Sequence, residues 1–150
     1  MAMVLIAEDN ADVCMVLKRV LTVANFDVVT APDGTTALDL AVAQHPDVVL
    51  TDLDMPGLTG LELTEALRGH PVERGVPILI LSGSLQRGDP RAAAAGVCDV
   101  RLKPFTNRDL VAAVQHLADI GRHRHDQGSS PCPLQPRPAA PADPGALADA

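Results

Sequence analysis

Residues 47–60, DVVLTDLDMPGLTG, decide which fold the chain can adopt. The apolar run Val48–Leu50 has the length of a buried strand, and DLD follows shortly after it at residues 52–54. MPG at 55–57 then breaks the chain, because proline lacks an amide hydrogen and glycine tolerates a positive φ. A carboxylate at the carboxyl end of a buried strand is a common place for chemistry in α/β folds. The stretch therefore predicts a strand and a turn, with Asp52 as a candidate functional residue.

The composition of the chain fits one domain with an aliphatic core. The 150 residues are 47% apolar, with two Phe and no Trp or Tyr. A core of Val, Leu, Ile and Ala suits a parallel sheet that is buried on both faces. The net charge of −7 offers no electrostatic surface to nucleic acid or to an anionic membrane, and the apolar runs are too short to span a bilayer.

The N-terminus and the cysteines favour a reduced, cytoplasmic protein. MAMVLIAEDN has no basic segment before its apolar stretch, so we expect no signal peptide. The three cysteines are odd in number and have no short metal-binding spacing. We expect Cys14 and Cys98 to be buried small hydrophobic residues, and a cytoplasmic location follows as an expectation.

Strand-like and helix-like patterns alternate along the first 120 residues. Short apolar runs predict strands at 3–7, 26–31, 47–51, 78–81 and 98–102. Apolar residues at helical spacing predict helices at 12–24, at 34–44, after Thr59, in the alanine-rich stretch before Gly96, and from Thr106 or Asn107 to about residue 120. Five strands that alternate with five helices, joined by short right-handed connections, predict an α/β, doubly wound parallel sheet.

Capping residues mark the expected helix starts. Asp12, Asp33, Thr59 and Asp89 precede the first four helices, and Pro90 follows its cap at the first helical position. The first helix is expected to bury one apolar face, made of Val13, Val16, Leu17, Val20, Leu21 and Ala24. The histidines at 45, 70 and 116 fall on polar faces or in loops, where we expect them to be solvated.

Residues 121–150 differ in kind from the rest. They contain six Pro and three Gly without any apolar periodicity, which predicts a Pro/Ala-rich disordered tail or a shortened linker. The expected organisation is therefore a domain at 1–120 and a tail at 121–150. With no second globular domain expected, the output would come through partner binding.

Chemically active residues gather at the predicted strand ends. Glu8 and Asp9 follow the first strand, Asp52 the third, Ser82 the fourth and Lys103 the fifth. Clustered carboxylates repel one another, and a divalent cation such as Mg²⁺ relieves that repulsion through oxygen ligands. Lys103 and Ser82 could then bind phosphoryl oxygens. The set predicts that the Asp52 carboxylate attacks phosphorus and becomes an aspartyl phosphate.

In this order, these motifs resemble the response-regulator receiver domain of two-component signalling. The resemblance covers residues 1–120 and rests on Glu8-Asp9, on DLDMPG at 52–57 with Gly60, on Ser82, and on KPF at 103–105. It implies a flavodoxin-like fold with strand order 2-1-3-4-5. It also implies a cis peptide bond at Lys103-Pro104.

The resemblance also implies a role for each site residue. Asp52 would be the phosphoacceptor, and Asp9 and Asp52 would hold Mg²⁺ directly, with the Asp54 main-chain carbonyl as a third ligand. Glu8 would act on the metal through water. Ser82 and Lys103 would receive the phosphoryl group. The chain would then be a switch and not an enzyme, with only self-phosphorylation from a donor and autodephosphorylation.

The implied donor is a phosphohistidine on a sensor histidine kinase or on a histidine phosphotransfer protein. A downstream protein target is expected, whereas contact with nucleic acid or a membrane is not. A homodimer through the fourth helix, fifth strand and fifth helix is a further expectation. The family usually has an aromatic residue three positions before the lysine, where this chain has Val100. The usual aromatic half of the switch is therefore missing.

Three alternatives stay open at this point. A phosphorelay intermediate would use the same residues. A haloacid-dehalogenase-type phosphatase is imitated by the Asp-x-Asp pattern at 52–54, with Asp54 as general acid, but its metal-binding acids should follow the lysine motif instead of preceding it. A degenerate receiver that serves only as a scaffold would not need the complete set of site residues.

Overall fold

The structure is a computed structural model that describes residues 2–84 and 89–123. The strands are β1 (Met3–Ala7), β2 (Asp27–Ala31), β3 (Val48–Asp52), β4 (Ile78–Ser82) and β5 (Asp99–Leu102). The helices are α1 (Ala11–Val23), α2 (Gly34–Gln44), α3 (Gly60–Arg68), α4 (Pro90–Ala95) and α5 (Asn107–Ile120). This alternation confirms the predicted element order. The predicted disordered tail falls, from residue 124 onward, outside the described residues.

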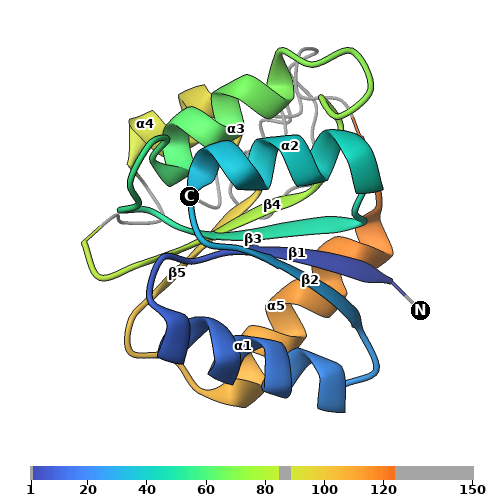
Figure 1. Ribbon diagram of the computed structural model, residues 1–150, viewed down its shortest axis with the longest axis vertical. Helices are drawn as coiled ribbons and strands as arrows, with labels where there is room; N and C mark the ends of the chain where they lie inside the picture. Colours follow the sequence, from blue (N-terminus) through green and yellow to red (C-terminus); the bar gives the residue numbers. More distant parts are fainter. Residues whose placement is uncertain (1, 85–88, 124–150) are drawn as a thin grey trace, which may run out of the picture.

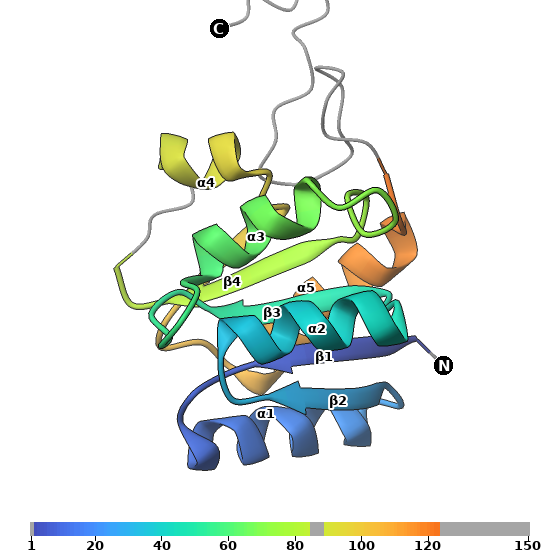
Figure 2. The same ribbon diagram turned by 45° about the horizontal axis from the view of Figure 1, so that its top comes forward.

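The five strands form one parallel sheet in the order β2-β1-β3-β4-β5, which confirms the predicted doubly wound topology (Figures 1 and 2). The register aligns the carboxyl ends of the strands. Ala7 pairs with Thr51, Asp52 with Leu81, and Ser82 with Leu102. Side chains that directly follow β1, β3, β4 and β5 therefore emerge at a single edge of the sheet.

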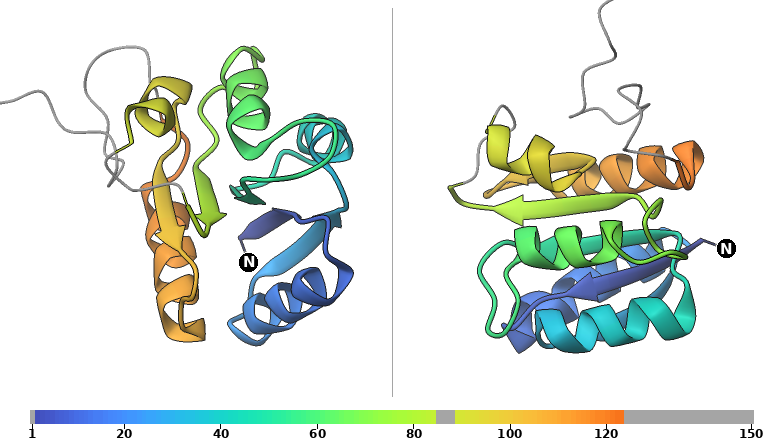
Figure 3. Two further views of the ribbon diagram at one scale, coloured as in Figure 1. Left: turned by 90° about the vertical axis from the view of Figure 1, so that its left-hand side faces the viewer. Right: turned by 90° about the horizontal axis from the view of Figure 1, so that it is seen from above.

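Helices cover both faces of the sheet. α1 and α5 lie on one face, and α2, α3 and α4 lie on the other (Figure 1), where they follow one another in the order α4, α3, α2 when seen from above (Figure 3). The three central strands are buried on both sides, so their residues are almost all aliphatic. Each fully buried Leu or Ile contributes about 1.5–3 kcal/mol relative to an exposed one, which explains how a core without Trp or Tyr suffices.

Four of the five predicted helix caps are confirmed. Asp33, Thr59, Asp89 and Thr106 each accept a backbone N–H of the first helical turn. The prediction for α1 was wrong, because Asn10 caps this helix and its Oδ1 accepts the amides of residues 12 and 13 at 3.0 and 3.1 Å. The acidic residue expected as the cap instead lies in the first turn, where its charge favours the helix dipole.

Two buried positions were also predicted wrongly. Val16 is 56% exposed, because Leu17 and Leu21 direct α1 toward the sheet and Val16 lies off that face. Cys14 is only half-buried, whereas Cys98 is buried as predicted.

The histidines at 45, 70 and 116 were predicted to be solvated; His45 is exposed as predicted, whereas His70 is half-buried, and both also have specific partners. The His45 side chain is 53% exposed, yet its Nδ1 lies 2.9 Å from Glu73 Oε2. His70 Nδ1 accepts the amides of Val72 and Glu73. His116 is exposed, as predicted. Within residues 2–84 and 89–123, no helix is both long and apolar enough to cross a membrane.

Candidate functional site

Four strand ends bring the predicted site residues to one edge of the sheet. Glu8 and Asp9 follow β1, and Asp52 ends β3; these three carboxylates can each offer an oxygen within 4.8 Å of the others. Lys103 follows β5, and its Nζ lies 3.3 Å from Asp52 Oδ1. The Lys103 amide also donates to the Ser82 carbonyl at 2.8 Å, which ties the ends of β4 and β5 together. The edge thus combines three carboxylates, one ammonium and one hydroxyl.

Glu8 is the most unusual member of this group. It is only 4% exposed, and Oε1 accepts the Asn10 amide at 3.1 Å, but Oε2 is buried without a hydrogen-bond partner among the described residues. Burial raises the pKa of Glu8 to about 7, and the nearby Asp52 carboxylate adds to the effect, although the Asn10 amide and Lys103 oppose it. A buried carboxylate oxygen without a donor is a position that a cation could satisfy.

The donor set fits a small hard cation. Mg²⁺ prefers oxygen ligands, usually one or two carboxylates, and keeps several bound waters. Asp9 is exposed and the Asp52 side chain is 14% exposed, so water can reach both. The buried Glu8 oxygen and the two accessible aspartates therefore could hold a divalent metal at this edge.

The backbone around Asp52 is closely packed. The Leu53 amide donates to Asp52 Oδ1 at 2.9 Å, and the Thr51 hydroxyl donates to the Asp52 carbonyl at 2.8 Å. A Cβ atom at Gly60 would lie 2.5 Å from that same carbonyl, so only glycine lets α3 begin directly behind the loop. The Asp52 carboxylate is therefore held by its own strand, by the loop and by Lys103.

The remaining predicted residues line the same region. Ser82 is 2% exposed, and its Oγ accepts the Ser84 amide at 3.0 Å. Asp54 is exposed in the loop after β3. The Lys103-Pro104 bond is cis, as the resemblance implied. Six predicted site residues thus lie at or beside the carboxyl edge of the sheet: Glu8, Asp9, Asp52, Asp54, Ser82 and Lys103.

Val100 is fully buried, in the place where an aromatic residue was expected on family grounds. It packs in an aliphatic cluster with Ile80, Ala92 and Ala95, between β4 and α4. Leu53, from the loop that follows Asp52, packs against the same cluster. The site loop and the α4 side of the sheet are therefore in contact through aliphatic side chains.

Two residues that support the site were not identified from the sequence. Asn10 donates its amide to Glu8 and caps α1, so one residue links the acidic pair to the helix. Its position before an amphipathic helix was a recognisable signal, since asparagine is a preferred cap. The Thr51 hydroxyl donates to the Asp52 carbonyl. No sequence pattern indicates this contact, because a threonine within a strand usually reflects strand propensity.

Comparison with known proteins places the chain in a family. The response regulator receiver domain family matches residues 4–115. The transcriptional regulatory protein PrrA of Mycobacterium tuberculosis is 38% identical over 115 residues, which are 76% of this chain and 48% of PrrA. The response regulator PleD of Caulobacter vibrioides is 32% identical over 117 residues, 77% of this chain and 26% of PleD. The chain therefore spans about half the length of PrrA and about a quarter of PleD.

Solved structures agree with this assignment. The chemotaxis response regulator CheY4 of Vibrio cholerae superposes with a TM-score of 0.74 at 30% identity, covering 78% of this chain and 98% of CheY4. The receiver domain of the sensor histidine kinase PA1611 from Pseudomonas aeruginosa, solved with a magnesium ion coordinated in its active-site cleft, gives 0.72 at 29% identity, covering 79% and 98%. The chain belongs to the response regulator receiver domain family, and its fold is that of a signalling switch.

Proposed function

We propose that Asp52 accepts a phosphoryl group and that the resulting aspartyl phosphate is the signal. The observation that carries this proposal is the position of the Asp52 carboxylate, which lies within 4.8 Å of the Glu8 and Asp9 oxygens and 3.3 Å from Lys103 Nζ. Phosphoryl transfer needs positive charge near the transferring oxygens and an oriented nucleophile, and this edge offers both.

The transfer step involves one bond formed and one broken. An Asp52 carboxylate oxygen attacks phosphorus, while the phosphorus–nitrogen bond of a donor phosphohistidine breaks and the imidazole leaves. The Lys103 ammonium offsets the negative charge of one phosphoryl oxygen, and the Ser82 hydroxyl donates to another. Mg²⁺, when bound at this site, would offset charge on the phosphoryl oxygens.

We assign the metal ligands to Asp9, Asp52 and the Asp54 main-chain carbonyl, with Glu8 acting through water. The unpartnered buried oxygen of Glu8 supports a cation at this position. The magnesium ion in the related PA1611 receiver domain supports the choice of metal. Membership of the receiver family supports a phosphoryl switch over the phosphatase alternative.

The donor we propose is a sensor histidine kinase or a histidine phosphotransfer protein, encountered in the cytoplasm. Output would pass from the domain at 1–120 to a protein partner, or to a second copy of the chain, through the α4, β5 and α5 face. Val100 and Leu53 belong to one aliphatic cluster under this face, which supports repacking as the transmission step in place of an aromatic switch. The DNA-binding response regulator MtrA of Mycobacterium bovis is a relative with 34% identity over 113 residues, but we propose no nucleic-acid contact by these residues, given the charge of −7.

The decisive experiment is covalent labelling by acetyl phosphate in the presence of Mg²⁺, followed by intact-protein mass spectrometry. Wild type should gain one phosphoryl group, and Asp52→Asn should gain none. Asp54→Asn is the matched control, because it removes a neighbouring acid of the same loop while leaving its backbone carbonyl; it should still be labelled. EDTA should abolish labelling of wild type. Equal labelling of wild type and Asp52→Asn would refute the assignment.

A further inference from the structure

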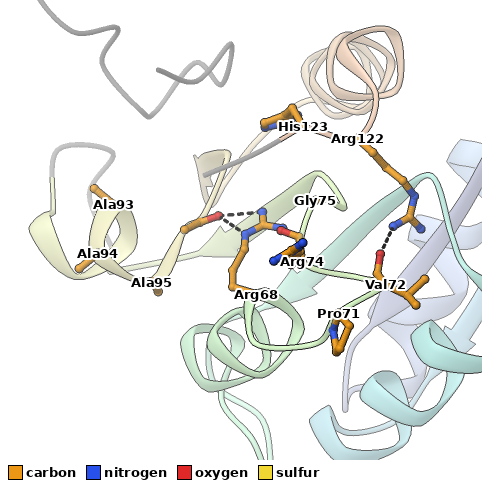
Figure 4. A pocket seen from close by; sticks show the side chains of 11 residues that line it. Arg68, Pro71, Val72, Arg74, Gly75, Ala93, Ala94, Ala95, Arg122 and His123 are labelled. Carbon is orange, nitrogen blue, oxygen red and sulfur yellow. Dashed lines mark hydrogen bonds between the residues drawn. The ribbon is translucent and has the colours of Figure 1, made fainter. Parts of the chain in front are cut away.

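A cavity lies at the edge of the sheet opposite to the carboxyl edge, away from Asp52. It has a volume of about 480 Å³ and is formed where α3 ends, where α4 ends, and where the chain leaves α5. Figure 4 shows the side chains of Arg68, Arg74 and Arg122 around this hollow, with Ala93–Ala95 on the α4 side. A volume of this size is typical of sites for small ligands.

The lining is strongly basic. Three arginines and His123 contribute to it, and no acidic side chain does among the described residues that line it. Three guanidinium groups thus gather at one hollow of a chain whose net charge is −7. A concave surface with one sign of charge attracts ligands of the opposite sign, because its walls focus the field.

Two of the arginines are fixed in place. Arg68 donates to the Gly96 carbonyl from Nε at 3.0 Å and from Nη2 at 2.8 Å, which covers the carbonyl end of α4 with positive charge. Its Nη1 donates to the carbonyls of Arg74 and Val76. Arg122 donates to the Val72 and Pro46 carbonyls, and to Glu73. These side chains are therefore preorganised walls, which need no ordering when a ligand binds.

The third arginine has the freedom that a ligand contact needs. Arg74 is exposed, and although its carbonyl accepts from Arg68, its guanidinium donates to none of the residues that the structure describes. Ala93, Ala94, Pro71 and Val72 add an apolar surface to the cavity. A guanidinium fork pairs best with planar or tetrahedral oxyanions, and several guanidiniums together favour a ligand of more than one negative charge.

From these contacts we propose that the cavity binds a small ligand that carries phosphate groups, with Arg74 as its principal contact. Arg68 supplies fixed positive charge around it, whereas the charge of Arg122 is offset by Glu73, and the alanine wall accommodates the apolar part of the ligand. The site is independent of the proposed phosphoacceptor, since none of its lining residues belongs to the carboxyl edge. It would give the receiver a small-molecule input in addition to its phosphoryl input.

The test is binding of pyrophosphate and of adenosine diphosphate to the full chain, measured by isothermal titration calorimetry at constant ionic strength with EDTA present. EDTA keeps divalent metal out of the Asp52 site, and every titration is repeated in Asp52→Asn. Saturable binding of either probe is expected, with the same affinity in both proteins. Arg74→Ala should weaken it by roughly tenfold or more, since a charge-assisted contact is lost.

Arg19→Ala is the matched control, because Arg19 is an exposed arginine on α1, outside the cavity. It should bind like wild type, and since Arg74 and Arg19 are both exposed, both variants should fold. Absence of saturable binding would overturn the proposal, as would equal binding by Arg74→Ala. If citrate bound as tightly as pyrophosphate, the assignment to phosphate ligands would be refuted. Binding lost in Asp52→Asn but kept in Arg74→Ala would place the anion at the carboxyl edge instead.

Discussion

Glu8 and Glu73 are both buried glutamates, at opposite edges of one sheet, and they differ in how their oxygens are satisfied. Glu73 is fully buried, and its two oxygens lie 3.0 Å from Arg122 Nη2 and 2.9 Å from His45 Nδ1. Glu8 is 4% exposed, and one of its oxygens has no partner among the described residues. Burial is nearly the same at the two edges, but only the Glu73 carboxylate is neutralised by the protein itself.

The difference supports our proposal that Glu73 is a structural charge and Glu8 a functional one. Glu73 joins the end of α2, the turn before β4 and the segment that follows α5, so its contacts hold three segments together. Glu8 has carboxylates for neighbours and a raised pKa, so its ionisation at neutral pH lowers the free energy of unfolding of the metal-free protein. A protein keeps such an unsatisfied acid where a ligand completes it. The carboxyl edge is accordingly the edge to which we assign the metal.

The largest expected effect is the pH dependence of stability caused by Glu8. Because its pKa is about 7 in the folded protein, against an ordinary value of 4.5, the folded state binds more protons than the unfolded chain between these values. The free energy of unfolding without metal should therefore fall by up to about 3 kcal/mol as the pH rises through this window. Glu8→Gln should lose this contribution and be more stable than wild type at pH 8.

Urea denaturation in EDTA, from pH 5 to pH 8, measures this difference. Glu65→Gln, at an exposed glutamate of α3, is the control and should follow the wild-type curve. Parallel curves for wild type and Glu8→Gln would show that Glu8 titrates normally, and the contrast with Glu73 would be lost.

At the other edge of the sheet we expect a smaller change in the free energy of unfolding, and a decrease instead of the increase expected for Glu8→Gln at pH 8. Glu73→Ala should lower the free energy of unfolding by about 2 kcal/mol, because it leaves Arg122 and His45 without their carboxylate. The value is moderate, since both partners are more than a third exposed and water screens them. Chemical denaturation at pH 7 gives the number.

Glu73→Ala should leave the affinity for Mg²⁺ unchanged, as measured by calorimetric titration, whereas Glu8→Gln should weaken that affinity. A loss of stability below about 0.5 kcal/mol in Glu73→Ala would place Glu73 among ordinary surface ion pairs. Weakened Mg²⁺ binding in that variant would show that the two edges are coupled.

The smallest expected effect concerns α3, which begins behind Asp52. Thr59 accepts the Glu62 amide at 3.2 Å, and Glu62 accepts the Thr59 amide at 3.1 Å, which forms a capping box. Thr59→Ala should cost about 1 kcal/mol of unfolding free energy. Thr22→Ala, at an exposed threonine of α1, should cost much less than this in the same thermal and urea measurements. Equal losses in the two variants would mean that the cap contributes nothing specific.

The regular parts of the fold could be predicted because they depend on local patterns. The five strand runs, the five helices and four of the five caps follow from periodicity and from residue preferences near each helix start. The cap of α1 was predicted wrongly because the helix could begin after either of two polar residues, Asn10 or Asp12. Val16 was wrongly placed on the buried face of the same helix. Which face of α1 is buried depends on its packing against the sheet, and local spacing alone does not decide it.

Chain order by itself determined which chemical groups follow each strand. Glu8, Asp9, Asp52, Ser82 and Lys103 each follow an apolar run, and parallel strands bring such ends to one edge. The family could be recognised for the same reason, and the match to residues 4–115 confirms it.

Only the tertiary structure decided which charges are satisfied. Residues far apart in the chain meet around Glu73, from His45 to Arg122, and no spacing rule joins them. The arginine cavity likewise draws its walls from α3, α4 and the residues after α5. A hydrogen bond depends on distances of about 3 Å between such segments, and those distances exist only once the sheet and helices have packed. The contrast between Glu8 and Glu73 is therefore a property of the packed fold.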